Sequence, residues 1–193
     1  MIVYHADTHC CLQEGQILNL NPALTPIYHL YPNGVSSYAD RAFLKPENEA
    51  QQAMQIIDTV FDYVRCIHFP DKPSRFTSVF ASACLEDSRT WLEEIAGGSV
   101  EDTHGCLSTS ISGIPIYEVE GSSVYIADAR FLDCGNVLQD TPFSLSTLFP
   151  FALAYWQSVQ LVDIARLGSM RQSYRKPELL LPPPVRVLRR VYP

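Results

Sequence analysis

Apolar side chains recur at helical spacing through residues 46–68. They are Ala50, Ala53, Met54, Ile57, Val60, Phe61 and Val64. This spacing places them on one face of a helix, and the polar residues between them occupy the other face. Pro70 follows, and proline ends a helix because it has no amide hydrogen to donate. The pattern therefore predicts a long amphipathic helix whose apolar face packs into the core.

The period of the apolar pattern changes from strand to helix within residues 73–96. Residues 76–81 are rich in β-branched and aromatic side chains that alternate between two faces, which predicts a buried strand. The following residues have helical spacing, with Leu85, Leu92 and Ile95 on one stripe. Two interpretations stay open here. The segment is either an ordinary corner of the core, or a strand that enters a helix through small residues and leaves room for a ligand.

Shorter patterns predict the other elements of the chain. Strands are expected at residues 1–5, 114–119, 123–127, 179–181 and 185–191, and helices at 128–132 and 144–166. Residues 114–119 and 123–127 are separated by a short turn with a glycine, which predicts a β-hairpin. Residues 21–40 contain three prolines and an Asn-Gly dipeptide, so we expect a long loop over the surface.

Length and charge limit the classes of protein to which the chain can belong. With 193 residues, 47% of them hydrophobic, the chain fits a single domain, residues 1–193, with a substantial core. A net charge of −7 with 14 Lys and Arg argues against broad electrostatic binding to nucleic acid or to an anionic membrane. No apolar run approaches the length of a membrane span, and residues 1–7 lack the regions of a signal peptide. We therefore expect a cytoplasmic location without membrane contact.

The cysteines and histidines favour neither a disulfide scaffold nor a metal site. Six cysteines are scattered along the chain, and Cys10 and Cys11 are adjacent, which suits reduced thiols better than a small oxidised scaffold. The sequence has no CxxC pair. His5 and His9 are four residues apart, but they lie where the sequence predicts extended chain. The sequence therefore predicts no bound metal.

Two polar side chains stand at the ends of predicted strands. His5 ends the first strand, where it can bind backbone atoms or point into a cleft between strands. Glu178 precedes the apolar residues 179–181, and an acid in this position is costly to bury unless it is paired or used in chemistry. Taken alone, Glu178 fits a solvated acid at a strand end.

Five motifs together resemble the ADP-ribosyltransferase superfamily. In chain order they are VYH, SVFASACLEDSRTW, IYEVEG, SVYIADARFLD and KPELLLPPPVRVLRRV. The resemblance covers most of the chain and is closest to the DarT-like and RNA 2′-phosphotransferase-like branches, including small bacterial and phage domains of unassigned function. It implies an α+β fold in which two antiparallel sheets splay around an NAD cleft with flanking helices. It also implies NAD as co-substrate, without a metal.

The resemblance implies catalytic roles for three kinds of side chain. His5 would hydrogen-bond the NAD ribose, and Phe76 or Phe80 would stack on the nicotinamide ring. Glu178 would be the catalytic glutamate that stabilises the oxocarbenium-like transition state. Glu118 on the predicted hairpin is a rival carboxylate, as is Glu120, but their place in the chain matches a structural strand of the family better.

The resemblance also implies a set of nucleotide contacts. Arg75 and Arg41 would bind the pyrophosphate through their guanidinium groups, although either could be a solvated arginine. Ala6, Asp7 and Ser78 are the remaining candidates for the NAD site. Many relatives have a glycine or serine directly after the histidine and then a threonine. Here Ala6 and Asp7 stand before the threonine, and phenylalanine stands where a stacking tyrosine is expected.

Three functions are consistent with the sequence. The first is an NAD-dependent mono-ADP-ribosyltransferase that modifies an acceptor of unknown identity, protein or nucleic acid. The second is a non-catalytic interaction module that keeps the fold. The third is the NAD-dependent removal of a 2′-phosphate from RNA, against which the acidic net charge counts because RNA phosphates call for clustered arginines.

Overall fold

The chain forms two antiparallel sheets with helices around them, which confirms the predicted α+β class. The computed structural model describes residues 1–22, 30–42, 49–97, 113–132, 145–160 and 176–192. The four-stranded sheet has the order β1–β4–β7–β2, and the three-stranded sheet has the order β3–β6–β5. The strands are β1 (Ile2–Ala6), β2 (Ile17–Leu18), β3 (Val79–Ala81), β4 (Ile116–Glu120), β5 (Tyr125–Asp128), β6 (Pro177–Leu181) and β7 (Val185–Tyr192).

The two sheets meet where β1 passes β3. Tyr4 and Ser82 form an isolated antiparallel bridge at this point. The amide of Tyr4 donates to the carbonyl of Ser82 at 3.0 Å, and the amide of Ser82 donates to the carbonyl of Tyr4 at 2.7 Å. This bridge therefore joins the edge of one sheet to the residue that follows β3 in the other.

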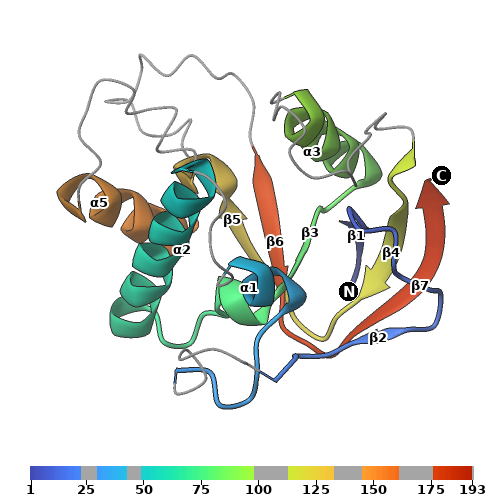
Figure 1. Cartoon of the computed structure of the whole chain (residues 1–193), viewed down its shortest axis with the longest axis horizontal. Coiled ribbons are helices and arrows are strands. Elements are labelled where there is room, and N and C mark those ends of the chain that lie inside the picture. The colour runs from blue at the N-terminus through green and yellow to red at the C-terminus, as the bar shows by residue number, and fades with distance from the viewer. Residues whose placement is uncertain (23–29, 43–48, 98–112, 133–144, 161–175, 193) are drawn as a thin grey trace.

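The helices lie on separate sides of the sheets. They are α1 (Ser37–Ala42), α2 (Glu49–His68), α3 (Leu85–Gly97) and α5 (Leu145–Trp156), with short 3₁₀ turns η2 (Arg75–Thr77) and η4 (Ala129–Leu132). Figure 1 shows α2 and α5 side by side next to the β3–β6–β5 sheet, on the side away from the other sheet. It shows α3 above β1 and β3.

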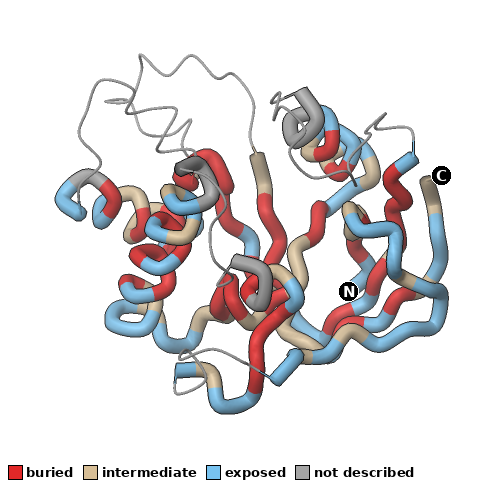
Figure 2. The backbone as a smooth tube through the Cα atoms, viewed as in Figure 1, coloured by how far each residue is buried: buried red, intermediate tan, exposed pale blue. Residues whose placement is uncertain are grey.

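The strand β6 separates two apolar clusters. Leu180 faces α2 and α5 and packs with Phe61, Tyr155 and Trp156 in what we name the helix-side core. Leu179 and Leu181 face the four-stranded sheet, with Val3, Val119 and Val187, in the inter-sheet core. Figure 2 shows buried residues along β6 and on the faces of α2 and α5 that point toward it. Side chains alternate along a strand, so Glu178 shares the face of Leu180.

Most of the predicted helices and strands are confirmed. The helix expected at residues 46–68 is α2, described from Glu49, and its stripe residues Ile57, Phe61 and Val64 are fully or almost fully buried. The helix predicted after the strand at residues 76–81 is α3, and the short helix predicted at residues 128–132 is η4. The strands expected at the two ends of the chain are β1 and β7.

The predicted β-hairpin is wrong. β4 pairs with β1 and β7, whereas β5 pairs with β6, so the two strands belong to different sheets. The turn at Gly121 carries the chain from one sheet to the other, and no room exists there for a side chain. A Cβ atom at Gly121 would lie 2.9 Å from Cδ2 of Leu181.

Three predicted boundaries also need correction. The strand expected from residue 76 begins at Val79, because Arg75–Thr77 forms a 3₁₀ turn that the Ser74 hydroxyl caps by accepting from the Phe76 amide. The loop predicted at residues 21–40 contains the start of α1. The helix predicted at residues 144–166 is described as α5 and ends at Trp156, followed by a turn in which Ser158 has a φ of 57°. Residues 161–175 lie outside the described part of the chain.

Cysteine pairing and membrane contact can be judged only for the described residues. Cys10, Cys11, Cys66 and Cys84 are in no disulfide. No helix among the described residues has both the length and the apolar character to cross a membrane.

Candidate functional site

Glu178 lies inside the protein and not on its surface. It is the second residue of β6, and 5% of it is exposed. Its Oε1 accepts a hydrogen bond from Nη1 of Arg75 and another from the hydroxyl of Tyr155. Among the described residues none donates to Oε2. The interpretation of Glu178 as a solvated strand-end acid is therefore wrong, because the carboxylate is buried and paired.

Arg75 joins two carboxylates that come from different elements. Its Nη1 binds Glu178 from β6, and its Nε donates to Oδ1 of Asp58 from α2 at 3.0 Å. Nη1 also donates to the Tyr155 hydroxyl at 3.1 Å. Arg75 is 3% exposed, and the η2 turn holds it in this position. The predicted pyrophosphate ligand thus stands, in this structure, at the centre of a buried ion cluster.

The charges in this cluster shift the pKa values of its members. Burial raises the pKa of Glu178, although the positive charge of Arg75 and the hydrogen bond from Tyr155 oppose the rise. Burial also raises the pKa of Tyr155, and the charge of Glu178 adds to it. Burial alone would lower the pKa of Arg75, but Glu178, Tyr155 and Asp58 raise it well above its ordinary value. Arg75 is therefore a permanent cation that faces two carboxylates.

Of the two candidate stacking residues, only Phe80 touches this cluster. The Arg75 guanidinium lies 4.8 Å from the centre of the Phe80 ring, in cation–π geometry. The Tyr38 ring meets Phe80 edge-on at 4.7 Å, and its hydroxyl donates to Asp58. Phe76 is instead packed against Tyr31 in a small separate cluster.

His5 reaches the cluster only through the backbone of β3. Its Nδ1 lies 2.6 Å from the carbonyl oxygen of Phe80, and the residue is half-buried. Burial lowers the pKa of His5, against the effects of the Phe80 carbonyl and the nearby Asp7. Alternation along β1 gives His5 the face of Val3, toward the inter-sheet core, whereas Glu178 faces the helix-side core. His5 and Glu178 are thus neighbours through Phe80 without a direct contact in the described structure.

Asp7, Ala6 and Ser78 make their contacts with residues other than Glu178 in the described structure. Asp7 is buried and closes the turn after β1, where its carboxylate accepts from the amides of Leu12 at 2.7 Å and His9 at 3.2 Å. Ala6 pairs with Ile116 at the end of β1. The Ser78 hydroxyl donates to the carbonyl of Ser74 at 2.7 Å. The side chain of Arg41 lies outside the described part of the chain.

Three residues of the cluster were not predicted from the sequence: Asp58, Tyr155 and Tyr38. The sequence does offer one indication for Asp58, which stands on α2 next to Ile57 of the apolar stripe. Asp62, one helical turn further on, is buried as well. Tyr155 looked like an ordinary core aromatic, since its hydroxyl partner is distant in the sequence. Tyr38 stood in a segment that was expected to be a surface loop.

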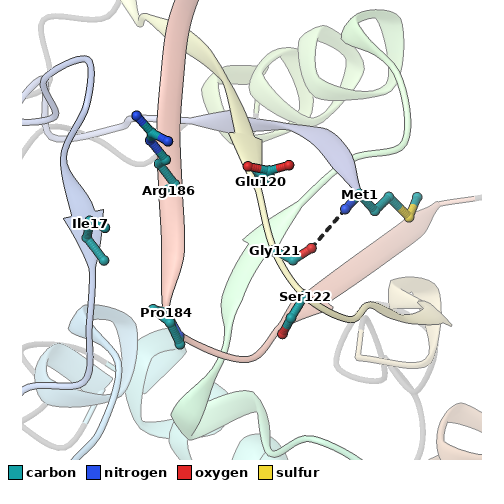
Figure 3. Close-up of a pocket in the computed structure, with 7 residues that line it drawn as sticks. All are labelled: Met1, Ile17, Glu120, Gly121, Ser122, Pro184 and Arg186. Carbon is teal, nitrogen blue, oxygen red and sulfur yellow. Dashed lines mark hydrogen bonds between the residues drawn. The ribbon is translucent and has the colours of Figure 1, made fainter.

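Two surface cavities of the molecule lie elsewhere. One cavity of about 410 Å³ lies over the four-stranded sheet, as Figure 3 shows. It is lined by Met1, Ile17, Glu120, Gly121, Ser122, Pro184 and Arg186. A second, of about 350 Å³, is lined by Asp71, Lys72, Pro73, Ser123, Val124, Tyr125 and Pro182. Neither is lined by Glu178, Arg75 or His5, so in this structure the buried cluster opens into neither cavity.

The described residues contain no group of three His, Cys, Asp or Glu side chains placed to hold a metal ion.

A scan against protein-family models found no match for the chain, and a search of curated proteins found none either. The chemistry of the site must therefore be argued from its own geometry. One carboxylate oxygen of Glu178 is held by two donors, while the second accepts no hydrogen bond from the described residues.

Proposed function

We propose that the protein is an NAD-dependent mono-ADP-ribosyltransferase in which Glu178 is the reacting carboxylate. The observation that carries the proposal is the arrangement of Glu178 at the start of β6. Arg75 and Tyr155 hold its Oε1, and Phe80 lies beneath Arg75. The resemblance of the motifs to the superfamily implies the catalytic role for the same glutamate.

The proposed chemistry uses an ionised Glu178. Cleavage of the bond between nicotinamide and ribose gives the ribose an oxocarbenium-like positive charge, and a fixed carboxylate stabilises this charge more than it stabilises the ground state. Oε2 is the oxygen that would face the ribose. Phe80 would stack on the nicotinamide ring, so that binding energy positions the bond that breaks. His5 faces the inter-sheet core whereas Glu178 faces the helix-side core, so the ribose contact implied for His5 is not part of this proposal. A nucleophilic atom of the acceptor then bonds to C1′ of the ribose, nicotinamide leaves, and the proton of the nucleophile passes to solvent.

Arg75 has a second role in this proposal. A guanidinium group binds phosphate with the same bidentate geometry with which it binds carboxylate. In this structure Arg75 is shared between Asp58 and Glu178. When NAD binds, its pyrophosphate would replace one of these carboxylates as a partner of Arg75. The ion cluster is then the ligand-free form of the site.

A non-catalytic interaction module is the second candidate, and the burial of the cluster favours it. Glu178 and Arg75 are 5% and 3% exposed and satisfy each other, as in a purely structural ion pair. In this alternative the cluster specifies how β6, α2, η2 and α5 pack together, and NAD has no site.

Thermal unfolding with nucleotides distinguishes the two candidates. If NAD binds the folded state, a concentration of about one hundred times its Kd stabilises the protein by roughly 2.7 kcal/mol, which raises the melting temperature by about 5–11 °C for a chain of this size. ATP at the same concentration is the control and should give no shift. Nicotinamide release is then measured with and without cell lysate as the source of acceptor. A shift with NAD together with release supports the transferase, and the absence of both supports the interaction module.

A further inference from the structure

The Tyr155 side chain contacts Glu178 from within the helix-side core. It lies on α5 with no exposed surface. Its ring meets Phe61 at 5.3 Å and Trp156 at 4.7 Å, both edge-on. Its backbone carbonyl accepts a hydrogen bond of 2.9 Å from the hydroxyl of Tyr125. Packing on two sides therefore fixes where the Tyr155 hydroxyl can lie.

The hydroxyl of Tyr155 makes two hydrogen bonds with a defined direction. Arg75 can only donate, so its Nη1, at 3.1 Å, must give a hydrogen to the Tyr155 oxygen. The single hydroxyl hydrogen of Tyr155 is then available for Oε1 of Glu178. Tyr155 thus links the cation to the carboxylate and donates to Glu178 in its ionised form.

Charged and titratable groups from several elements surround Glu178. Asp58 on α2 disfavours its charge, while Arg75 on η2 and Lys176, just before β6, favour it. Tyr38 on α1 faces Asp58 and Arg75 and binds the Asp58 carboxylate. Burial disfavours the ionised state of Glu178. The Tyr155 hydroxyl, which packing holds in place, favours that state because it donates a hydrogen bond to the carboxylate.

We propose that Tyr155 is a positioning residue for Glu178: its hydroxyl fixes Oε1 beside Arg75, keeps the carboxylate ionised, and so presents Oε2 to the ligand. The inference rests on the proposed function for its consequence in catalysis. The effect on the carboxylate itself follows from the geometry alone. The two parts can therefore be tested separately.

The test is Tyr155→Phe, with Tyr117→Phe as the matched control. Both remove one hydroxyl from a buried tyrosine, but the Tyr117 hydroxyl lies in the inter-sheet core and donates to the carbonyl of Leu12 at 3.0 Å, whereas that of Tyr155 donates to Glu178. Carbon-13 NMR of labelled glutamate, with the Glu178 signal assigned through Glu178→Gln, gives the pKa of Glu178 directly. A lost hydrogen bond to a charged group corresponds to roughly one pKa unit or more. We expect the pKa of Glu178 to rise by about this amount in Tyr155→Phe and to stay unchanged in Tyr117→Phe.

Nicotinamide release gives the second readout. The acidic limb of the pH–rate profile of Tyr155→Phe should move to higher pH by the same amount, so that its rate below the limb falls by about tenfold. Raising the pH should restore most of this loss. Glu178→Gln should recover at no pH, because it has no carboxylate to ionise.

Each outcome decides one of the two claims. An unchanged pKa of Glu178 in Tyr155→Phe overturns the positioning role. A raised pKa without nicotinamide release from any variant or from the wild type supports the positioning role and overturns the proposed transferase. If Tyr155→Phe does not fold, a fluorinated tyrosine at position 155 keeps the hydroxyl and makes it a stronger donor. The pKa of Glu178 should then fall, and no change would count against the inference.

Discussion

Two glutamate–arginine pairs in this protein have the same chemical groups and opposite surroundings. Glu178 and Arg75 join β6 to η2 beneath two helices, where both are buried. Glu118 and Arg189 join β4 to β7 in the other sheet, with bonds of 2.7 and 3.0 Å, and the Arg189 side chain is 68% exposed. Both pairs are joined by direct hydrogen bonds, so solvent and neighbouring groups account for what distinguishes them.

The two carboxylates are shifted in opposite directions. Burial raises the pKa of Glu178 despite its partners. The hydrogen bonds from Arg189 lower the pKa of Glu118, because solvent still reaches that carboxylate and little opposes its charge. Electrostatic interactions are stronger where water is excluded. A buried carboxylate can therefore stabilise a developing positive charge more than a carboxylate that solvent reaches. This difference favours Glu178 over Glu118 as the reacting group.

Removal of the buried arginine should have the largest effect on stability. Arg75→Met keeps most of the side-chain volume but leaves Asp58 and Glu178 buried without their cation. Breaking a buried pair from one side costs about 3–5 kcal/mol. We expect the free energy of unfolding in urea to fall by this amount, and to recover in part at acidic pH, where the carboxylates become neutral.

The matched control for this variant is Arg189→Met. Exposed ion pairs contribute little to stability, so its unfolding midpoint should equal that of the wild type within error. Equal losses in Arg75→Met and Arg189→Met would contradict the distinction between the two pairs.

A smaller effect is expected from the tyrosine that binds Asp58. Tyr38→Phe removes the hydroxyl that donates to this buried carboxylate but keeps the ring against Phe80. The loss of one partner of a buried acceptor costs about 1–3 kcal/mol. Tyr63→Phe on α2 is the control, because Tyr63 is 62% exposed and its hydroxyl should not matter. If both variants unfold at the same urea concentration as the wild type, Tyr38 does not support the cluster.

The pH dependence of the two glutamates should differ in sign. Their ordinary pKa is 4.5, and NMR titration of the carboxyl carbons should place Glu178 above it and Glu118 below it. A raised folded pKa means that the contribution of Glu178 to stability is complete below pH 4.5 and is lost as the pH rises through the folded value. A lowered pKa means that the contribution of Glu118 is present above pH 4.5 and is lost as the pH falls through its folded value. Two shifts of the same sign would contradict this account.

Local patterns predicted much of the fold because they depend on neighbouring residues. The apolar stripe of α2 and the strand-to-helix change before α3 could be seen in short windows of sequence. The position of Glu178 beside a strand followed from the apolar residues after it. The resemblance to a family added the candidates Arg75 and Phe80, and the structure places Arg75 against Glu178 and Phe80 against Arg75.

What the sequence missed depends on distant pairing. A short turn with glycine looks the same whether it joins two strands of one sheet or leads from one sheet to another, so β4 and β5 were taken for a hairpin. The burial of Glu178 was missed for a similar reason. Its partners Arg75 and Tyr155 lie 103 and 23 residues away, and nothing in a local pattern indicates that they meet.

The central claim is that buried Glu178, and not half-buried Glu118, stabilises the transition state in which NAD is cleaved. Nicotinamide release is measured for the wild type, Glu178→Gln and Glu118→Gln, with NAD binding followed in parallel by thermal shift. Loss of one electrostatic contact to a transition state lowers turnover by about a hundredfold or more, and we expect this loss in Glu178→Gln with NAD binding retained. Glu118→Gln should release nicotinamide at the wild-type rate. Wild-type release from Glu178→Gln, or a comparable loss in Glu118→Gln, would contradict the claim.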